Sequence, residues 1–534
     1  MIKRTISIAP LATFVQRTQI MHTKFKHHSK RALKLYLSAH KISIRITSVS
    51  LGLLFYVVLQ PSTGFAQVDT VDSAKYELYR PKLILDFPIM DFPYLQNAAQ
   101  TSANHRLNQF AGASGTTNAG DYLMAYNSPS MRQVTAIAKN VHSTGYFISN
   151  SLWYRWVKPT TWKRKLLNRL GANATAAIPD YLLTMYPLGI GWAHEEFHRN
   201  AMTLRGISSY NSIWDIGRFK GTVNSIKDED LIRFKAKYPN EIIRVHSAGI
   251  EGQYVFIQAM QKDDFFHQTH YPNTIFNILL TKHAVDYVGF ASNREHGAER
   301  LRYIQNETTV AERDFTGWDL NAWVYDLFRP QEPYEARGIH PTGTGLRRDR
   351  VPSDFTPEEF AYAEKVGKLQ YFNFISPHLL GISRIKVNNN FAFNFAARHY
   401  LTSFGYDLGG DLFLKMKDKN ILLTWHGYNN KDRFFPGVEA QLLDLPLKLT
   451  AKTLPLTVRT MLWLQPKDQM FDTDKGQAGG LLYAQLHSPK TKTWQPYLEV
   501  EAKTKGWVAG NPFLDANFTV RAGVSAYFNF KPKK

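Results

Sequence analysis

Two histidines and a glutamate in the stretch GWAHEEFHRNAM have the types and the spacing to bind a metal ion and to use it. His194 and His198 are four residues apart, so on a helix their imidazoles share one face and can each direct a ring nitrogen at the same ion. Glu195 follows the first histidine and lies within reach of a water molecule bound there. The chemistry expected of this group is the activation of water for hydrolysis.

The sequence before the motif favours a buried helix. Residues 181–193 are almost entirely apolar, which predicts that the motif helix is entered from the buried side of the fold. Imidazoles in such a place need a partner, and a metal ion is one. A surface helix with two solvated histidines is the alternative interpretation.

The third ligand of such a site must be His, Glu or Asp, because the chain contains no cysteine. A second apolar stretch of helical length, residues 241–260, contains Glu251 as its only acid after Glu241. A lone carboxylate on an apolar helix is costly to bury unless it meets a cation, so Glu251 is the predicted third ligand. A buried ion pair with Arg244 is the alternative for Glu251, and His246 is the second candidate ligand.

With these residues the chain resembles the gluzincin metallopeptidases, in which H-E-x-x-H on one helix is completed by a glutamate on a later helix. The resemblance implies that His194, His198 and Glu251 bind Zn²⁺ and that Glu195 is the general base of peptide hydrolysis. It covers about 60 of the 534 residues. Glu251 is followed by Gly252 and Gln253, without the aspartate that several gluzincin families place a helical turn later, so the hydrogen-bond partner of a ligating histidine is unidentified.

The residues around Glu251 also predict close helix packing. Small side chains there would let this helix approach the motif helix; they are Ser247, Ala248, Gly249 and Gly252.

Four further polar residues are candidates for supporting the metal ligands or contacting a substrate: His246, His283, Asp286 and Arg347. His283 and Asp286 interrupt the apolar helix predicted for residues 272–291, where polar groups are usually satisfied within the fold. Arg347 lies in the loop-like stretch GIHPTGTGLRRDR, where it or the adjacent Arg348 could orient a substrate carboxylate. The alternative interpretation of His246 is a histidine buried in the core. The alternative for Arg347 is a loop residue in solvent.

Residues 1–66 have the features of a signal peptide. They contain ten Lys or Arg and no Asp or Glu, then an apolar run at 49–59, then small residues suited to cleavage before Gln67. The run is short for a membrane span, and a permanent N-terminal anchor is the alternative. Removal of the ten cations from the net charge of +21 leaves +11, spread along the chain without a nucleic-acid motif, so nucleic acid is not an expected partner. The lack of cysteine fits an exported bacterial protein and excludes a lipoprotein anchor.

The remainder divides into three parts. Residues 67–122 are predicted to be an extended leader, in which DFPIMDFPYL suits an extended strand lying on a surface or, as the alternative, a binding segment. Helical periodicity dominates residues 123–381, with helices expected at 228–237, 241–260 and 272–291 and another beginning at Thr356-Pro357-Glu358-Glu359; residues 314–350 are expected to be irregular.

From residue 382 to 534 the period changes to two. In residues 518–530 apolar side chains alternate with Thr519, Arg521, Ser525 and Asn529, and about eight such strands predict a small antiparallel β-barrel. If the apolar face points outward the barrel lies in a membrane; if inward it binds a ligand as lipocalins do. Strand length and an aromatic-rich last strand, which resembles the closing strand of bacterial outer-membrane proteins, favour the membrane, although the KPKK tail departs from that pattern.

The predicted fold is α+β and multidomain, a mainly helical zincin-like domain followed by the small barrel. The expected function is a zinc-dependent peptidase, acting on a peptide or protein and anchored in the lipid of the bacterial outer membrane; the periplasm is the alternative location. A barrel whose helical domain binds a partner, with an incidental or degenerate H-E-x-x-H, is the non-enzymatic alternative, and hydrolysis of a different bond is a third. An eight-stranded barrel is too narrow for a wide pore, so no porin activity is expected. The sequence does not indicate the oligomeric state.

Overall fold

The computed structural model describes residues 81–530 apart from 217–220, 270–273, 450–451 and 492. The described residues all belong to one compact unit of the chain. The predicted signal peptide, residues 1–66, lies outside them.

Helices and strands follow one another in the order β, then mainly α, then β. The helices are α3 (Tyr94–Gln109), α4 (Ala119–Ala125), α5 (Met131–Trp156), α6 (Trp162–Leu182), α7 (Ile190–Thr203), α8 (Asp228–Lys237), α9 (Pro239–Lys262), α10 (Thr274–Phe290), α11 (Arg294–Ile304), α12 (Asp319–Phe328) and α13 (Pro357–Leu369). The strands are β1 (Lys82–Phe92), β2 (Tyr210–Asn211), β3 (Val223–Asn224), β4 (Ile385–Asn388), β5 (Phe391–Thr402), β6 (Gly405–Met416), β7 (Lys419–Asn429), β8 (Phe434–Leu449), β9 (Lys452–Pro466), β10 (Gly476–His487), β11 (Trp494–Lys503) and β12 (Asn517–Asn529).

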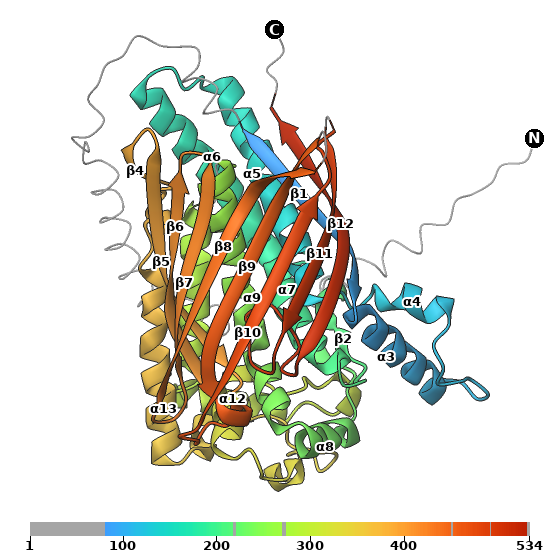
Figure 1. The fold of residues 1–534 in the computed structure, drawn as a ribbon. Coiled ribbons are helices and arrows are strands. Elements are labelled where there is room, and N and C mark those ends of the chain that lie inside the picture. Colours follow the sequence, from blue (N-terminus) through green and yellow to red (C-terminus); the bar gives the residue numbers. More distant parts are fainter. Residues whose placement is uncertain (1–80, 217–220, 270–273, 450–451, 492, 531–534) are drawn as a thin grey trace, which may run out of the picture. The chain divides into compact units, whose positions relative to one another are not determined.

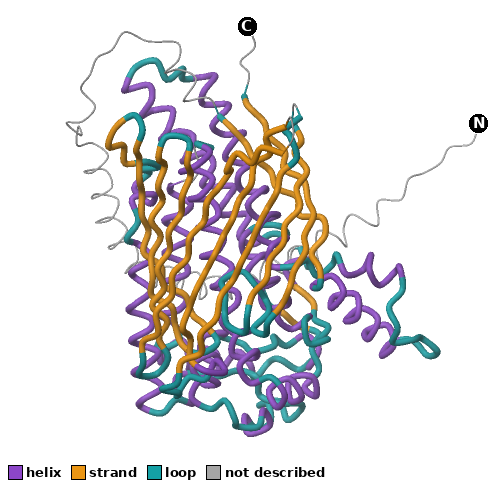
Figure 2. The backbone as a smooth tube through the Cα atoms, viewed as in Figure 1, coloured by secondary structure: helices purple, strands orange, loops and turns teal. Residues whose placement is uncertain are grey.

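Ten strands form one antiparallel sheet in the order β1-β12-β11-β10-β9-β8-β7-β6-β5-β4 (Figures 1 and 2). Within the described residues β1 and β4 are its free edges, so the sheet is open and the predicted closed barrel of about eight strands is wrong. Nine of the ten strands, β4 to β12, lie in the C-terminal region, and the tenth comes from the predicted leader, where β1 pairs with β12 so that Leu85 lies opposite Ala526. Helices α5 and α9 pack on the inner face and occupy the space that a small barrel would enclose. The broad α+β class and the antiparallel pairing agree with the prediction.

Alternation along the strands places apolar side chains on the outer face of the sheet. On β12 Phe518 is 63% exposed whereas Arg521 is 6% exposed, and on β9 Leu462 is 64% exposed whereas the adjacent Met461 is 1% exposed. The two-residue period therefore separates an apolar exterior from an interior that contains many charged groups.

Ion pairs join this interior to the helices. Arg132 of α5 lies 2.6 Å from Asp86 of β1 and 2.9 Å from Glu499 of β11. Gln258 of α9 donates to Asp411 of β6 at 3.0 Å, and that carboxylate also accepts from Arg398 at 2.6 Å. Buried charges need such partners, so the polar residues of α5 and α9 determine how the helices dock on the sheet.

Several helices form where the sequence predicts them. Helix α8 spans the predicted residues 228–237, and α13 begins with a capping box in which Thr356 and Glu359 bond each other's backbone N–H groups. The stretch 314–350 is less irregular than predicted, because it contains α12. Among the described residues no helix is both long enough and apolar enough to cross a membrane.

The apolar run before the motif is only partly buried. Ile190 and Trp192 lie in the core, but Tyr181, Leu182 and Met185, at and after the end of α6, are largely exposed. The prediction that the motif helix is entered from the buried side therefore holds for its first turn, whereas the first half of the run contributes to the molecular surface.

Replacement of Arg132 by Met tests the ion pairs that dock α5 on the sheet. We expect Arg132→Met to lower the free energy of unfolding by about 2–4 kcal/mol, because it leaves two poorly solvated carboxylates without their guanidinium. Arg233→Met on α8 is the control, since Arg233 is largely exposed and, among the residues that the structure describes, forms an ion pair with its neighbour Asp230 alone, a contact worth under about 1 kcal/mol. Urea unfolding of both variants gives the comparison, and equal losses would contradict the role of Arg132.

Candidate metal centre

Helix α7 presents the motif, and its first turn is held by a buried histidine. His142 of α5 accepts a hydrogen bond from the backbone N–H of Ile190 at 3.2 Å, while its other ring nitrogen lies 3.1 Å from Asp180. Glu196, the second glutamate of the motif, pairs with Arg199 at 2.7 Å and accepts from Asn211 at 2.8 Å. Glu196 therefore has a structural role, and the predicted motif helix is confirmed.

The two motif histidines converge on one carboxylate. Nε2 of His194 lies 3.3 Å from Oδ2 of Asp319, and Nε2 of His198 lies 3.2 Å from the same oxygen. Donor atoms about 3.3 Å apart are what tetrahedral zinc with bonds of about 2.0–2.1 Å requires. Nε2 of His198 is buried and makes no well-aligned hydrogen bond to any described residue. Among the described residues, these three side chains are the group whose donor atoms lie close enough together to hold a metal ion.

Gly249 of α9 leaves room beside the two histidine nitrogens. A Cβ atom at this position would lie 2.3 Å from Nε2 of His194 and 2.4 Å from Nε2 of His198. A Cβ at Gly252 would lie 2.8 Å from the ring of Phe197. The prediction that small residues let this helix approach the motif helix closely is therefore confirmed, and the space that they leave lies at the candidate metal position.

Hydrogen bonds at the other ring nitrogens suit metal binding. Nδ1 of His198 meets the carbonyl oxygen of Val245, which can only accept, so in the neutral ring that binds a metal the proton is on Nδ1 and Nε2 carries the lone pair. Nδ1 of His194 lies 3.0 Å from Nε2 of Gln253, whose Oε1 is buried without a partner among the described residues. Turning this amide by 180° lets Oε1 accept from Nδ1–H, which frees Nε2 of His194 for a metal. Gln253 is the partner that the sequence left unidentified.

Asp319 was not among the predicted residues. It is the first residue of α12, in the stretch that the sequence marks as irregular, and it accepts a hydrogen bond from Tyr287 at 2.9 Å. Burial would raise the pKa of Asp319, but the two histidines beside it hold that pKa well below its usual range. Burial likewise opposes a charge on His198, yet the Asp319 carboxylate raises the pKa of His198 to about 9. The cluster thus attracts positive charge, as a cation site must.

Glu251 does not join this cluster. Its carboxylate accepts from Arg244 at 2.8 Å, from the backbone N–H of Gly510 at 2.8 Å and from the indole of Trp507 at 3.3 Å. The structure therefore corrects the predicted third ligand: Glu251 is the buried ion-pair partner that the sequence offered as the alternative, and Asp319 stands beside the histidines instead.

Of the other candidates, only His283 reaches the site. His246 lies 2.9 Å from Asp326 and 3.0 Å from Thr316, as a satisfied core histidine. Asp286 pairs with Lys282, and Arg347 pairs with Asp354 at 2.7 Å. These three are therefore occupied by local partners, whereas His283 of α10 lines the pocket described next.

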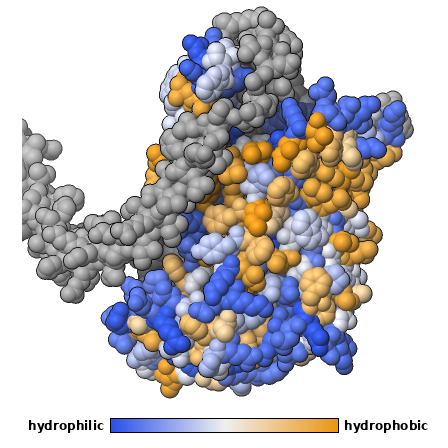
Figure 3. All heavy atoms as spheres, turned by 90° about the vertical axis from the view of Figure 1, so that its left-hand side faces the viewer, coloured by the Kyte–Doolittle hydropathy of each residue, from blue (hydrophilic) through white to orange (hydrophobic). Residues whose placement is uncertain are grey.

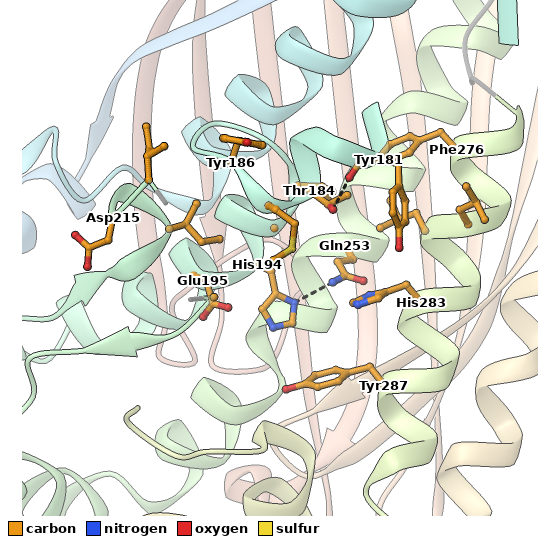
Figure 4. A pocket seen from close by; sticks show the side chains of 18 residues that line it. Tyr181, Thr184, Tyr186, His194, Glu195, Asp215, Gln253, Phe276, His283 and Tyr287 are labelled. Carbon is orange, nitrogen blue, oxygen red and sulfur yellow. Dashed lines mark hydrogen bonds between the residues drawn. The ribbon is translucent and has the colours of Figure 1, made fainter. Parts of the chain in front are cut away.

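A pocket of about 290 Å³ opens beside the metal cluster. Figure 4 shows His194 and Glu195 from α7 and His283 and Tyr287 from α10 around this space. Its remaining walls are mainly apolar and include Ile190, Ile213, Phe276, Leu279 and Leu280. Burial raises the pKa of Glu195 to about 8, so this carboxyl group can exchange a proton near neutral pH.

Comparisons of the chain with protein-family models, with curated proteins and with solved structures find no match. The function is therefore inferred from the residues themselves. Their donor set, two imidazoles and one carboxylate around a small space, fits Zn²⁺.

Separate substitutions of Asp319 and Glu251 test which of the two carboxylates is a metal ligand and which is only an ion-pair partner. Asp319→Ala should weaken zinc binding by more than the 10- to 100-fold typical of losing an outer hydrogen-bond partner. Glu251→Gln should keep its zinc and unfold at a lower temperature, because Arg244 loses its buried counter-charge. The zinc content of both variants is measured by plasma mass spectrometry, and their unfolding temperatures are measured by thermal unfolding. Loss of zinc from Glu251→Gln but not from Asp319→Ala would show that Glu251 is the ligand.

A methyl group at position 249 tests the location of the metal. Gly249→Ala should abolish stoichiometric zinc, because the new Cβ would overlap the two Nε2 atoms. Gly289→Ala on α10 is the matched control, since a Cβ there meets nothing within 4 Å. A Gly249→Ala protein that is folded by circular dichroism and still binds one zinc would show that the metal lies elsewhere.

Proposed function

We propose that this protein is a zinc-dependent hydrolase that cleaves peptide bonds. The observation that carries the proposal is the convergence of His194, His198 and Asp319, of which His194 lies with the adjacent Glu195 in the wall of one pocket. A bound zinc ion would polarise the substrate carbonyl and make water a better nucleophile. The residues of the chain account for the remaining steps.

Glu195 is the proposed proton carrier. It lines the pocket next to His194, and burial favours its protonated form enough for it to hold a proton after taking one. It accepts a proton from the attacking water and returns it to the leaving amine, so no proton is gained or lost over the cycle. Gln253 keeps the His194 ring oriented during this exchange.

The pocket walls indicate which part of a peptide fits. Ile213, Phe276 and Leu280 offer an apolar surface to one side chain of the substrate. His283 brings an imidazole to the same pocket, where its ring N–H can donate a hydrogen bond to a carbonyl oxygen, whereas the one O–H of Tyr287 is already donated to Asp319. A peptide with an apolar residue next to the scissile bond combines these two needs. Esters and other amides share the same chemistry and are the nearest alternative substrates.

The non-enzymatic alternative treats the motif as incidental. In that case the helices bind a partner, and the Nε2 atoms of the two histidines face the Asp319 carboxylate without a metal ion between them. Zinc that binds stoichiometrically and depends on His194 favours the enzyme, whereas a protein that stays metal-free after chelator-free purification favours the alternative.

The Glu195→Gln variant separates catalysis from metal binding. We expect it to retain one zinc per chain, because Glu195 is not a ligand, and to hydrolyse peptides about 10²- to 10⁴-fold more slowly. Mass spectrometry of a peptide library incubated with the wild-type chain identifies a substrate, and its kcat is then measured for the variant. Glu196→Gln is an unsuitable control because Glu196 is buried in an ion pair, so Glu229→Gln, at an exposed position on α8, is used.

Equal turnover by wild type and Glu195→Gln would contradict the assigned base. Absence of cleavage by a zinc-loaded wild type across peptide, ester and amide libraries would contradict the hydrolase itself.

A further inference from the structure

We propose that the outer face of the ten-stranded sheet contacts the acyl chains of a lipid bilayer. This outer sheet face is represented by six outward side chains, each 51–65% exposed: Trp425, Val438, Leu462, Leu482, Leu498 and Phe518. The proposal concerns the surface of the molecule and is independent of whether the metal centre is active.

The apolar side chains are contiguous across neighbouring strands. Trp425 of β7 lies opposite Val438 of β8, which lies opposite Leu462 of β9. Leu482 of β10 and Phe518 of β12 lie on either side of Ala502 of β11. Singly exposed hydrophobic residues are common on soluble proteins, but rows that continue over several strands indicate a surface that is covered.

The polarity of the sheet is the reverse of that in a soluble protein. A sheet with one face in water usually turns its apolar side chains to the core and its polar ones to solvent. Here Asp411, Glu499 and Arg521 are almost fully buried on the inner face, while the outer face is apolar. Outward apolar and inward polar residues are the pattern of strands that cross a membrane.

The curvature of the sheet favours lipid over a second copy of the chain. One polar cavity of about 320 Å³ is lined by β1 at Asp86, by β5 at Arg398 and by strands between them in the sheet, such as β9 at Arg459. Strands from opposite ends of the sheet border a single cavity only if the inner face is concave. The outer face is then convex, and two convex faces meet along a narrow line, whereas fluid acyl chains cover the whole surface.

Strand length and the distribution of polar groups agree with contact between the outer sheet face and lipid. Strands β8 and β9 contain 16 and 15 residues, more than the 9–11 that a tilted strand needs to cross the hydrocarbon layer. On the side of the molecule seen in Figure 3, hydrophobic residues gather above a lower end that is mainly hydrophilic. This is the end at which α8 lies in Figure 1, and it is the part expected in water.

The lack of cysteine permits a direct test. Leu462→Cys and Leu482→Cys on the outer sheet face, and Arg233→Cys on α8 as control, are each labelled with bimane in the full chain. The proteins are reconstituted from detergent into phosphatidylcholine vesicles with or without brominated acyl chains. We expect bromine to reduce the fluorescence at 462 and 482 by about twofold or more and to leave the label at 233 nearly unchanged, because bromine quenches only labels within the hydrocarbon layer. Aqueous iodide should quench the label at 233 more strongly than the labels at 462 and 482.

Two results would overturn the proposal. If iodide quenches all three labels equally in vesicles and bromine quenches none, the outer sheet face is in water. If the labels at 462 and 482 are shielded from iodide without lipid or detergent, and the chain sediments as a dimer, the face is covered by a second copy. Neither result depends on zinc or on hydrolysis, so a failed lipid proposal and a failed enzyme proposal are distinguishable.

Discussion

The close contact between α7 and α9 at Gly249 is the constraint on which the candidate metal centre depends. Any side chain larger than hydrogen at that position would occupy the space onto which both motif histidines open. Helix α9 can come so near only because the residue that faces α7 one turn further on is Gly252, against Phe197. The same helix carries Gln253 to His194 and the Val245 carbonyl to His198. One helix therefore both makes room for a cation and sets which nitrogen of each histidine can bind it.

The opposite side of α9 is tied to the sheet by buried polar contacts. Glu251 receives hydrogen bonds from Trp507 and Gly510, which lie between β11 and β12, and Gln258 reaches Asp411 of β6. Contacts of this kind are costly unless every partner is in place, so they tolerate few alternative positions of the helix. Correct pairing of the sheet is thus a condition for the geometry of the candidate metal centre, although no strand contributes a side chain to the cluster of His194, His198 and Asp319.

Local patterns were enough to predict much of the fold. The motif helix, α8, the capped start of α13 and the two-residue period of the C-terminal strands all depend on residues near one another in the sequence, and they agree with the structure. The number of strands and the closure of the sheet were not predictable in this way. They depend on β1 pairing with β12 and on helices filling the concave face, and neither interaction leaves a local pattern.

The third ligand shows why a site is harder to predict than a helix. Glu251 and Asp319 are both acids in apolar surroundings, and burial penalises their charges alike. What distinguishes them is the partner. Arg244 lies two helical turns before Glu251 on the same face and satisfies it locally, whereas Asp319, at the start of α12, meets two imidazole nitrogens brought by another helix. The Glu251 carboxylate is neutralised by the guanidinium of Arg244 and needs no metal ion. The Asp319 carboxylate faces two imidazole nitrogens that can each offer a lone pair, so the three groups together form a candidate site for a cation.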